Sequence, residues 1–226
     1  MGNRIIMVDP WYDRDPTLFE IQKREVQSEY PNLHFYREHD LIFVRGSFPL
    51  IDAGRVLDRF SIEIELPRNR QEDIPIIRET GGRIPRISVN HINVNNQAGD
   101  ICLFVPEERW RIFPVGSSLL KFLNGPVRNY FLGYALKELG DPWPFGERLH
   151  GKAGIFEYYG ELLGTSDEQV IRKYIQCLSK KTFKRHWPCP CGSGKKIRNC
   201  HVAEIQELRE KVPWSYALKS LEHLRC

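Results

Sequence analysis

The stretch HINVNNQAGDICL, residues 91–103, carries the pattern around which the chain is organised. A His-x-Asn comes first, a polar loop with one glycine follows, and Cys102 then stands between two aliphatic residues. This arrangement is typical of a nucleophilic thiol at Cys102, with Asn93 donating a hydrogen bond to a developing oxyanion and His91 shaping the loop. The alternative is a buried structural cysteine after a turn, which is what most single cysteines are.

The same stretch resembles the active-site loop of ubiquitin-conjugating enzymes, in which His-Pro-Asn precedes a Gly-containing loop, the thioester cysteine and a leucine. His91, Asn93, Cys102 and Leu103 match that pattern. The resemblance implies that these residues have the family's catalytic roles. Two features depart from it: Ile92 replaces the proline, which leaves the loop less fixed, and the spacing from His to Cys is one residue longer.

The segments before this loop follow the element order of the same family. A helix is predicted over residues 16–30, because Asp15 can cap it and Pro16 suits its first position. A meander of three strands is expected next, and its clearest strand, residues 60–66, alternates apolar and polar side chains. A charged, proline-containing loop, residues 67–85, then leads towards the cysteine. The resemblance therefore implies an α+β, ubiquitin-conjugating-like fold with an antiparallel meander sheet flanked by helices.

Helical spacing of apolar residues predicts a helical region over residues 117–139, capped by Ser117. Pro126 inside it predicts either a kink or two helices, the second starting near Pro126. The run WPFGERLHGKAGIFEYY, residues 143–159, resembles the C-terminal part of bacterial conjugating-enzyme-like proteins found in anti-phage (CBASS) operons. His150 in this run is a further candidate base for Cys102, although a histidine beside glycine in such a turn is more often structural.

A helix over residues 167–178 is expected after this run, with Ser166 as its cap and Gln169 completing a capping box. Cys177 on this helix is expected to be packed in the core. Two short helices are predicted near the end of the chain, over residues 203–211 and 214–224.

A second motif, CPCGSGKKIRNCH, occupies residues 189–201. Three thiols and one imidazole at this spacing suit a closed, tetrahedral, structural zinc site, and the glycines allow the backbone to turn around the ion. The motif resembles the SEC-C motif in its Cys-Pro-Cys-Gly-Ser-Gly-Lys-Lys core and its closing Cys-His. The predicted metal ligands are Cys189, Cys191, Cys200 and His201.

The chain has 226 residues, of which 41% are hydrophobic and 27% charged, and a net charge of +4. These values are ordinary for a globular protein. A ubiquitin-conjugating-like domain is expected over residues 1–164, a helical linker over 165–187 and a SEC-C zinc-binding module over 188–226. No run is long and apolar enough to span a membrane, and six cysteines without an export signal indicate reduced thiols in the cytoplasm.

The function expected from the resemblance is that of a thioester-forming transferase. Cys102 would accept the C-terminal carboxyl of a protein and pass it to an amine. In bacterial anti-phage systems the resemblance implies a cGAS-like nucleotidyltransferase as the protein substrate, and a ubiquitin-like protein is the other candidate. The sequence has no Gly-x-Gly-x-x-Gly motif for a nucleotide, so either an activating enzyme would act in trans or the protein would receive its cargo by another route.

The alternative is a catalytically inactive scaffold of the same fold that binds a protein or a nucleic acid through its zinc knuckle. A solvated basic face is the plainer explanation of the charges there, and the modest net charge makes nucleic acid the less favoured partner. The cations around the motif are Lys180, Lys181, Lys184, Arg185, Lys195, Lys196 and Arg198.

Overall fold

The computed structural model describes residues 9–70, 73–94, 97–144, 149 and 151–225. The chain divides into two compact units. Unit 1 comprises Met1–Phe104 and Phe113–Phe145, and unit 2 comprises Val105–Ile112 and Gly146–Cys226. Each unit has its own hydrophobic core. The described part of the chain contains no helix with the length and apolar composition needed to cross a bilayer.

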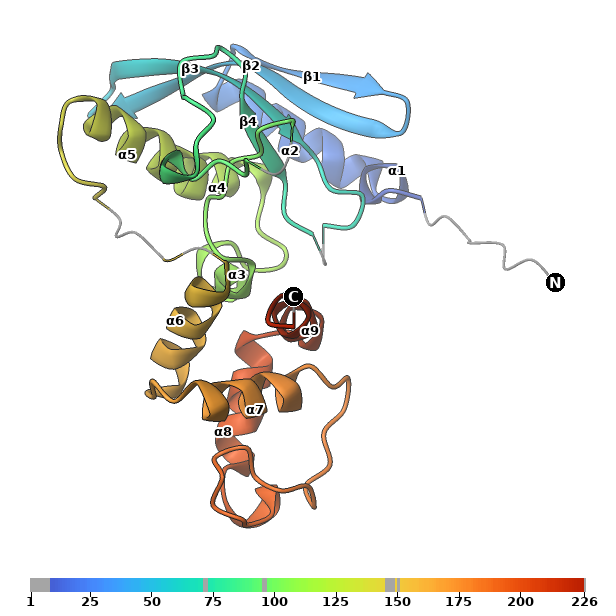
Figure 1. Ribbon diagram of the computed structural model, residues 1–226. Coiled ribbons are helices and arrows are strands. Elements are labelled where there is room, and N and C mark those ends of the chain that lie inside the picture. Colours follow the sequence, from blue (N-terminus) through green and yellow to red (C-terminus); the bar gives the residue numbers. More distant parts are fainter. Residues whose placement is uncertain (1–8, 71–72, 95–96, 145–148, 150, 226) are drawn as a thin grey trace. The chain divides into compact units, whose positions relative to one another are not determined.

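Unit 1 is an α+β structure built on a four-stranded antiparallel sheet of order β1-β2-β3-β4 (Figure 1). Its elements are α1 (Trp11–Arg14), α2 (Pro16–Glu29), β1 (Leu33–Glu38), β2 (Leu41–Asp52), β3 (Arg55–Glu65), β4 (Ile76–Glu79), η1 (Ser88–Asn90), α4 (Leu119–Phe122), the π-helical turn η3 (Leu123–Val127) and α5 (Arg128–Glu138).

One face of the sheet is apolar and packs against helices, whereas the other carries charged side chains. In β3, Phe60, Ile62 and Ile64 are buried and alternate with polar residues, as the sequence predicts. Phe131 of α5 stacks on Phe60 with ring centroids 4.6 Å apart. Helices α2, α4 and α5 lie on this apolar side of the sheet (Figure 1).

Strand β2 is long and runs without interruption from Leu41 to Asp52. It passes through Gly46, which pairs with Leu33 of β1. The φ of Gly46 is +148°, and a Cβ added there would lie 1.9 Å from the carbonyl oxygen of Asn32. The strand can continue at this point because glycine has no side chain to meet the neighbouring backbone.

The predicted first helix is confirmed as α2: the Asp15 carboxylate accepts a hydrogen bond from the Leu18 N–H at 3.0 Å, and Pro16 takes the first position. The helical region around Pro126 is confirmed, with a correction to its start. Ser118, not Ser117, is the cap, because its side chain accepts from the Lys121 N–H and the helix begins one residue later than expected.

Pro126 does not divide that region into two separated helices. It lies within η3, where the looser π-helical turn accommodates the missing N–H, and α5 continues directly from it.

Unit 2 is helical and includes the segment predicted to bind metal. Its elements are η2 (Pro106–Glu108), α3 (Arg109–Ile112), α6 (Gly151–Leu163), α7 (Glu168–Leu178), η4 (Ile197–Asn199), α8 (Val202–Lys211) and α9 (Trp214–His223). The helices predicted over residues 167–178, 203–211 and 214–224 are confirmed. The cap of α7 is a correction: Asp167, not Ser166, accepts from the N–H groups of Gln169 and Val170.

The two units differ from the expected division into residues 1–164, 165–187 and 188–226. Helix α6 was not predicted, and α7 was expected in a linker. Both contribute buried side chains to the core that also contains Cys189 of the metal motif. The buried residues of α7 are Ile171, Tyr174, Ile175, Cys177 and Leu178.

The short segment Val105–Ile112 belongs to unit 2 although unit 1 residues precede and follow it. The Tyr158 hydroxyl donates to the Glu107 carbonyl at 2.9 Å, and the Arg109 guanidinium donates to the Tyr216 hydroxyl at 3.0 Å. Glu107 and Arg109 are both buried, so these contacts tie the segment into the core of α6 and α9.

Candidate functional site

The Cys102 loop begins and ends at a short antiparallel pairing beside β4. Ile92 and Ile101 form an isolated bridge, the Cys102 N–H donates to the His91 carbonyl at 2.7 Å, and the Asn93 N–H donates to the Asp100 carbonyl at 2.8 Å. The Ile101 N–H also donates to a carbonyl of β4 at 2.8 Å. The three residues predicted to be catalytic therefore lie at the base of one hairpin.

One side of this hairpin is apolar and packs into the core, and the other side faces away from the core. Ile92 and Ile101 are 4% and 8% exposed and belong to the core of unit 1. Because successive side chains along paired strands point to opposite faces, Asn93 and Cys102 belong to the side away from the core. Both are exposed. The sulfur is therefore accessible, and the amide lies on the same side of the hairpin.

His91 is held by packing against an aromatic side chain. Its φ is 53°, in the left-handed region, and it ends η1. The ring of Trp143 lies 4.9 Å from the imidazole and 5.7 Å from the ring of Tyr130. A Cβ at Gly133 of α5 would meet Trp143 at 3.0 Å, so glycine makes room for the indole. His91 thus occupies a fixed place at the start of the loop.

The residue before His91 is fixed by three hydrogen bonds. Asn90 is buried, and its amide donates to the Pro85 carbonyl at 2.9 Å. Its carbonyl accepts from the Tyr130 hydroxyl at 2.7 Å, and its side-chain oxygen accepts from Lys137 at 3.1 Å. Helix α5 therefore positions the first side of the hairpin.

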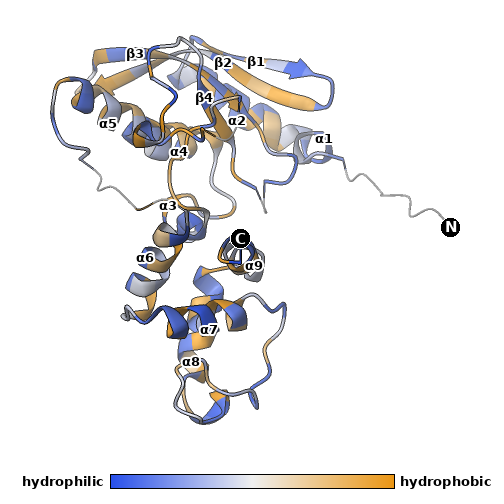
Figure 2. Cartoon of the chain, viewed as in Figure 1, coloured by the Kyte–Doolittle hydropathy of each residue, from blue (hydrophilic) through white to orange (hydrophobic). Residues whose placement is uncertain are grey.

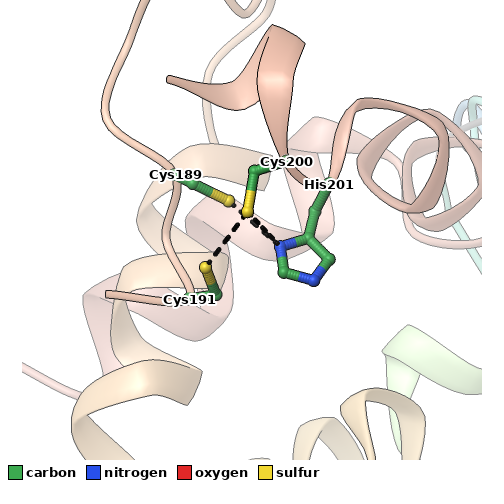
Figure 3. Close-up of side chains that lie close together, drawn as sticks. All are labelled: Cys189, Cys191, Cys200 and His201. Carbon is green, nitrogen blue, oxygen red and sulfur yellow. Dashed lines mark hydrogen bonds between the residues drawn. The ribbon is translucent and has the colours of Figure 1, made fainter. Parts of the chain in front are cut away.

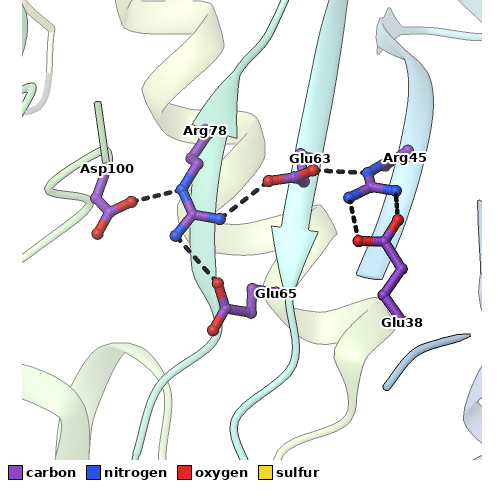
Figure 4. Close-up of polar contacts among 6 residues, drawn as sticks. All are labelled: Glu38, Arg45, Glu63, Glu65, Arg78 and Asp100. Atoms are coloured by element: carbon purple, nitrogen blue, oxygen red, sulfur yellow. Dashed lines mark hydrogen bonds and ion pairs between the residues drawn. The ribbon is translucent and has the colours of Figure 1, made fainter. Parts of the chain in front are cut away.

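The second side of the hairpin is held by Arg78 of β4 (Figure 4). The Arg78 Nε donates to the Asp100 carboxylate at 2.7 Å, and its two other nitrogens donate to Glu63 and Glu65 at 2.9 and 3.0 Å. Glu63 also accepts from Arg45 at 2.6 Å. This ion-pair network crosses the open face of the sheet and ends two residues before Cys102.

A second arginine contacts the tip side of the loop. The Arg86 guanidinium donates to the Gln97 carbonyl at 2.7 Å and lies against Gly99. Gly99 has a φ of +73°, and a Cβ there would come within 3.0 Å of the guanidinium. Glycine is thus required both by the backbone conformation and by the approach of Arg86.

The electrostatic environment of Cys102 favours the protonated thiol. Although the residue is exposed, the protein that surrounds its sulfur removes water and raises the pKa of the thiol, and the negative charge of Asp100 raises it further. The ion pair of Asp100 with Arg78 opposes that second effect. Cys102 is therefore an accessible thiol that is not ionised in advance.

The second motif forms a candidate metal site (Figure 3). The ligand atoms of its three cysteines and one histidine all lie within 4.8 Å of one another. The Nδ1 atom of His201 is 3.2 Å from the sulfurs of both Cys189 and Cys200, and the sulfur of Cys191 is 3.6 Å from that of Cys200. Ligands of one tetrahedral zinc ion are separated by about 3.6–3.8 Å, so the donor set fits such an ion.

The turn within the motif brings the ligands together. Gly192 and Gly194 have φ values of 82° and 73°, which favour glycine. The Ser193 hydroxyl lies 3.2 Å from the sulfur of Cys191, and this hydrogen bond lowers the pKa of the Cys191 thiol to about 6. A thiol that ionises readily is suited to metal coordination.

A carboxylate stands behind the imidazole of His201. Glu204, in the first turn of α8, has an oxygen 3.6 Å from the Nε2 atom of His201, and Tyr174 of α7 hydrogen-bonds to Glu204. A carboxylate on the second nitrogen fixes the ring orientation and raises the basicity of a histidine ligand. The core of unit 2 therefore supports the site from behind.

Two further sequence interpretations concern Cys177 and His150. Cys177 is buried, and burial raises the pKa of its thiol, as expected of a packed cysteine. His150 lies outside the described residues. Sequence reasoning missed Arg78, Arg86 and Glu204, which support the two sites from outside the motifs that were recognised.

Comparison with known proteins gives one short similarity. A 34-residue stretch in the SEC-C-like region is 47% identical to part of the protein translocase subunit SecA of Azobacteroides pseudotrichonymphae genomovar. CFP2. It covers 15% of this chain and 3% of that protein. No family model matches the chain, and no solved structure matches it. The similarity therefore concerns the region of the metal motif alone.

Proposed function

We propose that the chain is a ubiquitin-conjugating-like enzyme in which Cys102 carries a protein C-terminus as a thioester and transfers it to a target. The observation that carries this proposal is the hairpin geometry. An exposed thiol stands directly opposite His91, and Asn93 lies on the same side of the hairpin. A cysteine that is exposed at the surface is what acyl transfer to a macromolecule requires.

The element order of unit 1 supports the proposed ubiquitin-conjugating-like fold. The short helix α1 and the longer α2 precede a four-stranded antiparallel meander, and a long segment then leads into the cysteine hairpin and a further helical region. This is the order that the resemblance of the cysteine stretch implies.

The proposed chemistry consists of two acyl transfers. The Cys102 thiolate attacks an activated C-terminal carbonyl, forming a C–S bond and expelling AMP or another thiol, which takes up the proton that Cys102 loses. A target amine then attacks the thioester, an amide forms, and the C–S bond breaks to return the thiol. Asn93 donates a hydrogen bond to the oxyanion in both steps, and His91 keeps the hairpin in shape.

The raised pKa of Cys102 has a consequence for these steps. A thiolate of raised pKa is a slower leaving group, so both hydrolysis and aminolysis of the thioester are slowed. It also means that the loading step depends on a strongly activated carbonyl. An activating enzyme in trans supplies that carbonyl in our proposal, and the cargo is the C-terminus of a cGAS-like nucleotidyltransferase or a ubiquitin-like protein in bacterial anti-phage defence.

Trapping of the covalent adduct tests the proposal. The purified chain is incubated with a C-terminally activated cargo protein and analysed on non-reducing gels. A thiol-sensitive adduct is expected with the native chain, an adduct stable to thiols with Cys102→Ser, and none with Cys102→Ala. Cys177→Ala is the matched control and retains the adduct. An adduct that persists in Cys102→Ala refutes the thioester role.

The alternative function is an inactive scaffold of the same fold, and the high pKa of the Cys102 thiol is the observation that favours it. Such a scaffold would bind its partner without a covalent step. The two functions differ in vivo: Cys102→Ala abolishes the activity of the enzyme and leaves that of the scaffold intact.

For unit 2 we propose a structural Zn²⁺ ion bound by Cys189, Cys191, Cys200 and His201. Four protein ligands leave no open position for a substrate, so the ion supplies stability to the turn rather than catalysis. The SecA-like stretch supports this assignment. Elemental analysis of the purified chain is expected to give one zinc per molecule, and none after Cys200→Ser.

A further inference from the structure

Two basic segments, residues 184–188 and 195–198, lie against each other beside the metal cluster. The Ile197 N–H donates to the Trp187 carbonyl at 2.9 Å, and the Arg198 N–H donates to the Arg185 carbonyl at 3.0 Å. Pro188 and Lys196 form an isolated antiparallel bridge. The structure thus brings cations from two parts of the sequence onto neighbouring backbones, about 5 Å apart.

These cations form what we call the basic surface, made up of Lys184, Arg185, Lys195, Lys196 and Arg198. All five are exposed. Within the described part of the chain none of them forms an ion pair, and the sequence from residue 169 to residue 203 contains no aspartate or glutamate. Figure 2 shows mostly hydrophilic residues along the segment that follows α7. A zinc site of three thiolates contributes a formal charge of only −1.

The fold does not use the charges of the basic surface. Arg209 of α8 provides the contrast, because its guanidinium donates to the carbonyls of Leu178, Lys180 and Lys181 and so closes the end of α7. Among the residues that the structure describes, the side chains of the basic surface make no such hydrogen bonds to the backbone. Five like charges on adjacent segments repel one another, at a cost in stability that an anionic partner would remove.

We propose that the basic surface binds the phosphate backbone of single-stranded nucleic acid. The sequence between Arg185 and the metal motif distinguishes this partner from an acidic protein. His186 is exposed among the cations, and Trp187 beside it is half-buried and packs partly against the core of unit 2. Bases stack on such rings while Lys and Arg neutralise the phosphates, whereas an acidic peptide has no bases that would stack on the rings. Binding is independent of Cys102 and of the proposed transferase.

Fluorescence anisotropy of the full chain with a labelled 20-nucleotide single-stranded RNA and DNA tests the proposal, between 50 and 200 mM salt. Each phosphate contact contributes roughly −0.7 to the slope of log K against log salt, so five contacts give a slope of about −3.5. Lys195→Gln with Lys196→Gln is expected to reduce the magnitude of the slope by about 1.4. Lys219→Gln, an exposed lysine on α9, is the matched control and leaves it unchanged.

A second variant, His186→Ala, separates stacking from charge. It is expected to weaken binding severalfold without changing the salt slope, because an exposed ring is removed and no phosphate contact is lost. Zinc content is measured for every variant to confirm that unit 2 is folded. The proposal is overturned if neither nucleic acid binds at 50 mM salt, if the lysine variants bind as the native chain does, or if polyglutamate of equal charge displaces the oligonucleotide with equal affinity.

Discussion

The two sulfur sites of this protein are built in opposite ways. All ligands of the metal site come from residues 189–201, and the turn that gathers them is part of the motif. The Cys102 site draws on β4, on the segment before η1, on α5 and on Trp143. A locally built site can be recognised from its sequence, whereas a site assembled from distant elements shows only its central residues.

The thiols at the two sites also differ in their chemistry. At the metal site a hydrogen bond from Ser193 lowers the pKa of Cys191 to about 6. At the hairpin, burial and Asp100 raise the pKa of Cys102. Cys191 therefore ionises readily, although burial raises the pKa of Cys189 in the same cluster to about 11. Cys102 stays a neutral thiol that reacts only with an activated partner.

The largest predicted effect follows from removing one ligand of the candidate metal site. Zinc binding to such a motif is worth roughly 10 kcal/mol, so Cys200→Ser is expected to unfold unit 2. Unit 1 is expected to stay folded, because it has a separate core. Hydrogen exchange followed by mass spectrometry resolves the two units, and Cys102→Ser is the control. Equal loss of protection in both units would show that they do not fold separately.

The second prediction concerns the Cys102 site, which distant elements hold together. Arg78→Ala leaves three carboxylates, those of Glu63, Glu65 and Asp100, without their shared partner. A cost of about 2 kcal/mol in unfolding free energy is expected for this partly buried network. Urea unfolding measures it. Arg45→Ala, at the more exposed end of the network, is the matched comparison and should cost less.

The third prediction tests whether the metal site also depends on residues outside the motif of residues 189–201. Glu204→Gln keeps the size of the side chain and removes the charge behind His201. Zinc affinity is expected to fall roughly tenfold, which competition with a chromogenic chelator measures. Glu207→Gln, one turn further along α8, serves as control. An unchanged affinity would mean that the site is wholly local.

The smallest predicted effect concerns the pH dependence of Cys102. The rate of alkylation by iodoacetamide follows the thiolate fraction. The midpoint of the pH profile of Cys102 should therefore lie at a higher pH than that of a free cysteine. Asp100→Asn removes a negative charge and should move the midpoint of the profile to lower pH. Arg78→Gln removes the positive charge that pairs with Asp100 and should move the midpoint to higher pH. Shifts in the same direction for both variants would contradict this electrostatic account.

The sequence predicts much of the fold where local rules apply. The alternation in residues 60–66, the cap at Asp15 and the kink region at Pro126 were all readable. Helix α6 was not predicted, because it follows a turn-like run and its sequence shows no strong helical spacing of apolar residues. Its tyrosines are buried in the core that α6 shares with α7 and α9. Two other caps, Ser118 and Asp167, lie one residue after the predicted Ser117 and Ser166.

The four candidate metal ligands were all named from the sequence, and the structure brings them together in one cluster that could hold a metal ion. For the hairpin, the sequence identified His91, Asn93 and Cys102 but not the arginines that hold it. No spacing rule links Arg78 to Asp100, since their proximity depends on the register between β4 and the hairpin. Long-range register is information that a single sequence does not display.

The passage of Val105–Ile112 through unit 2 limits how this protein can be dissected. A truncation that begins at Gly146 would discard Glu107 and Arg109, and with them the polar partners of Tyr158 and Tyr216. The C-terminal part of the gene alone therefore does not encode the whole of unit 2. Exchange of the metal-bearing part between proteins would need two simultaneous grafts, which favours inheritance of the two units as a pair.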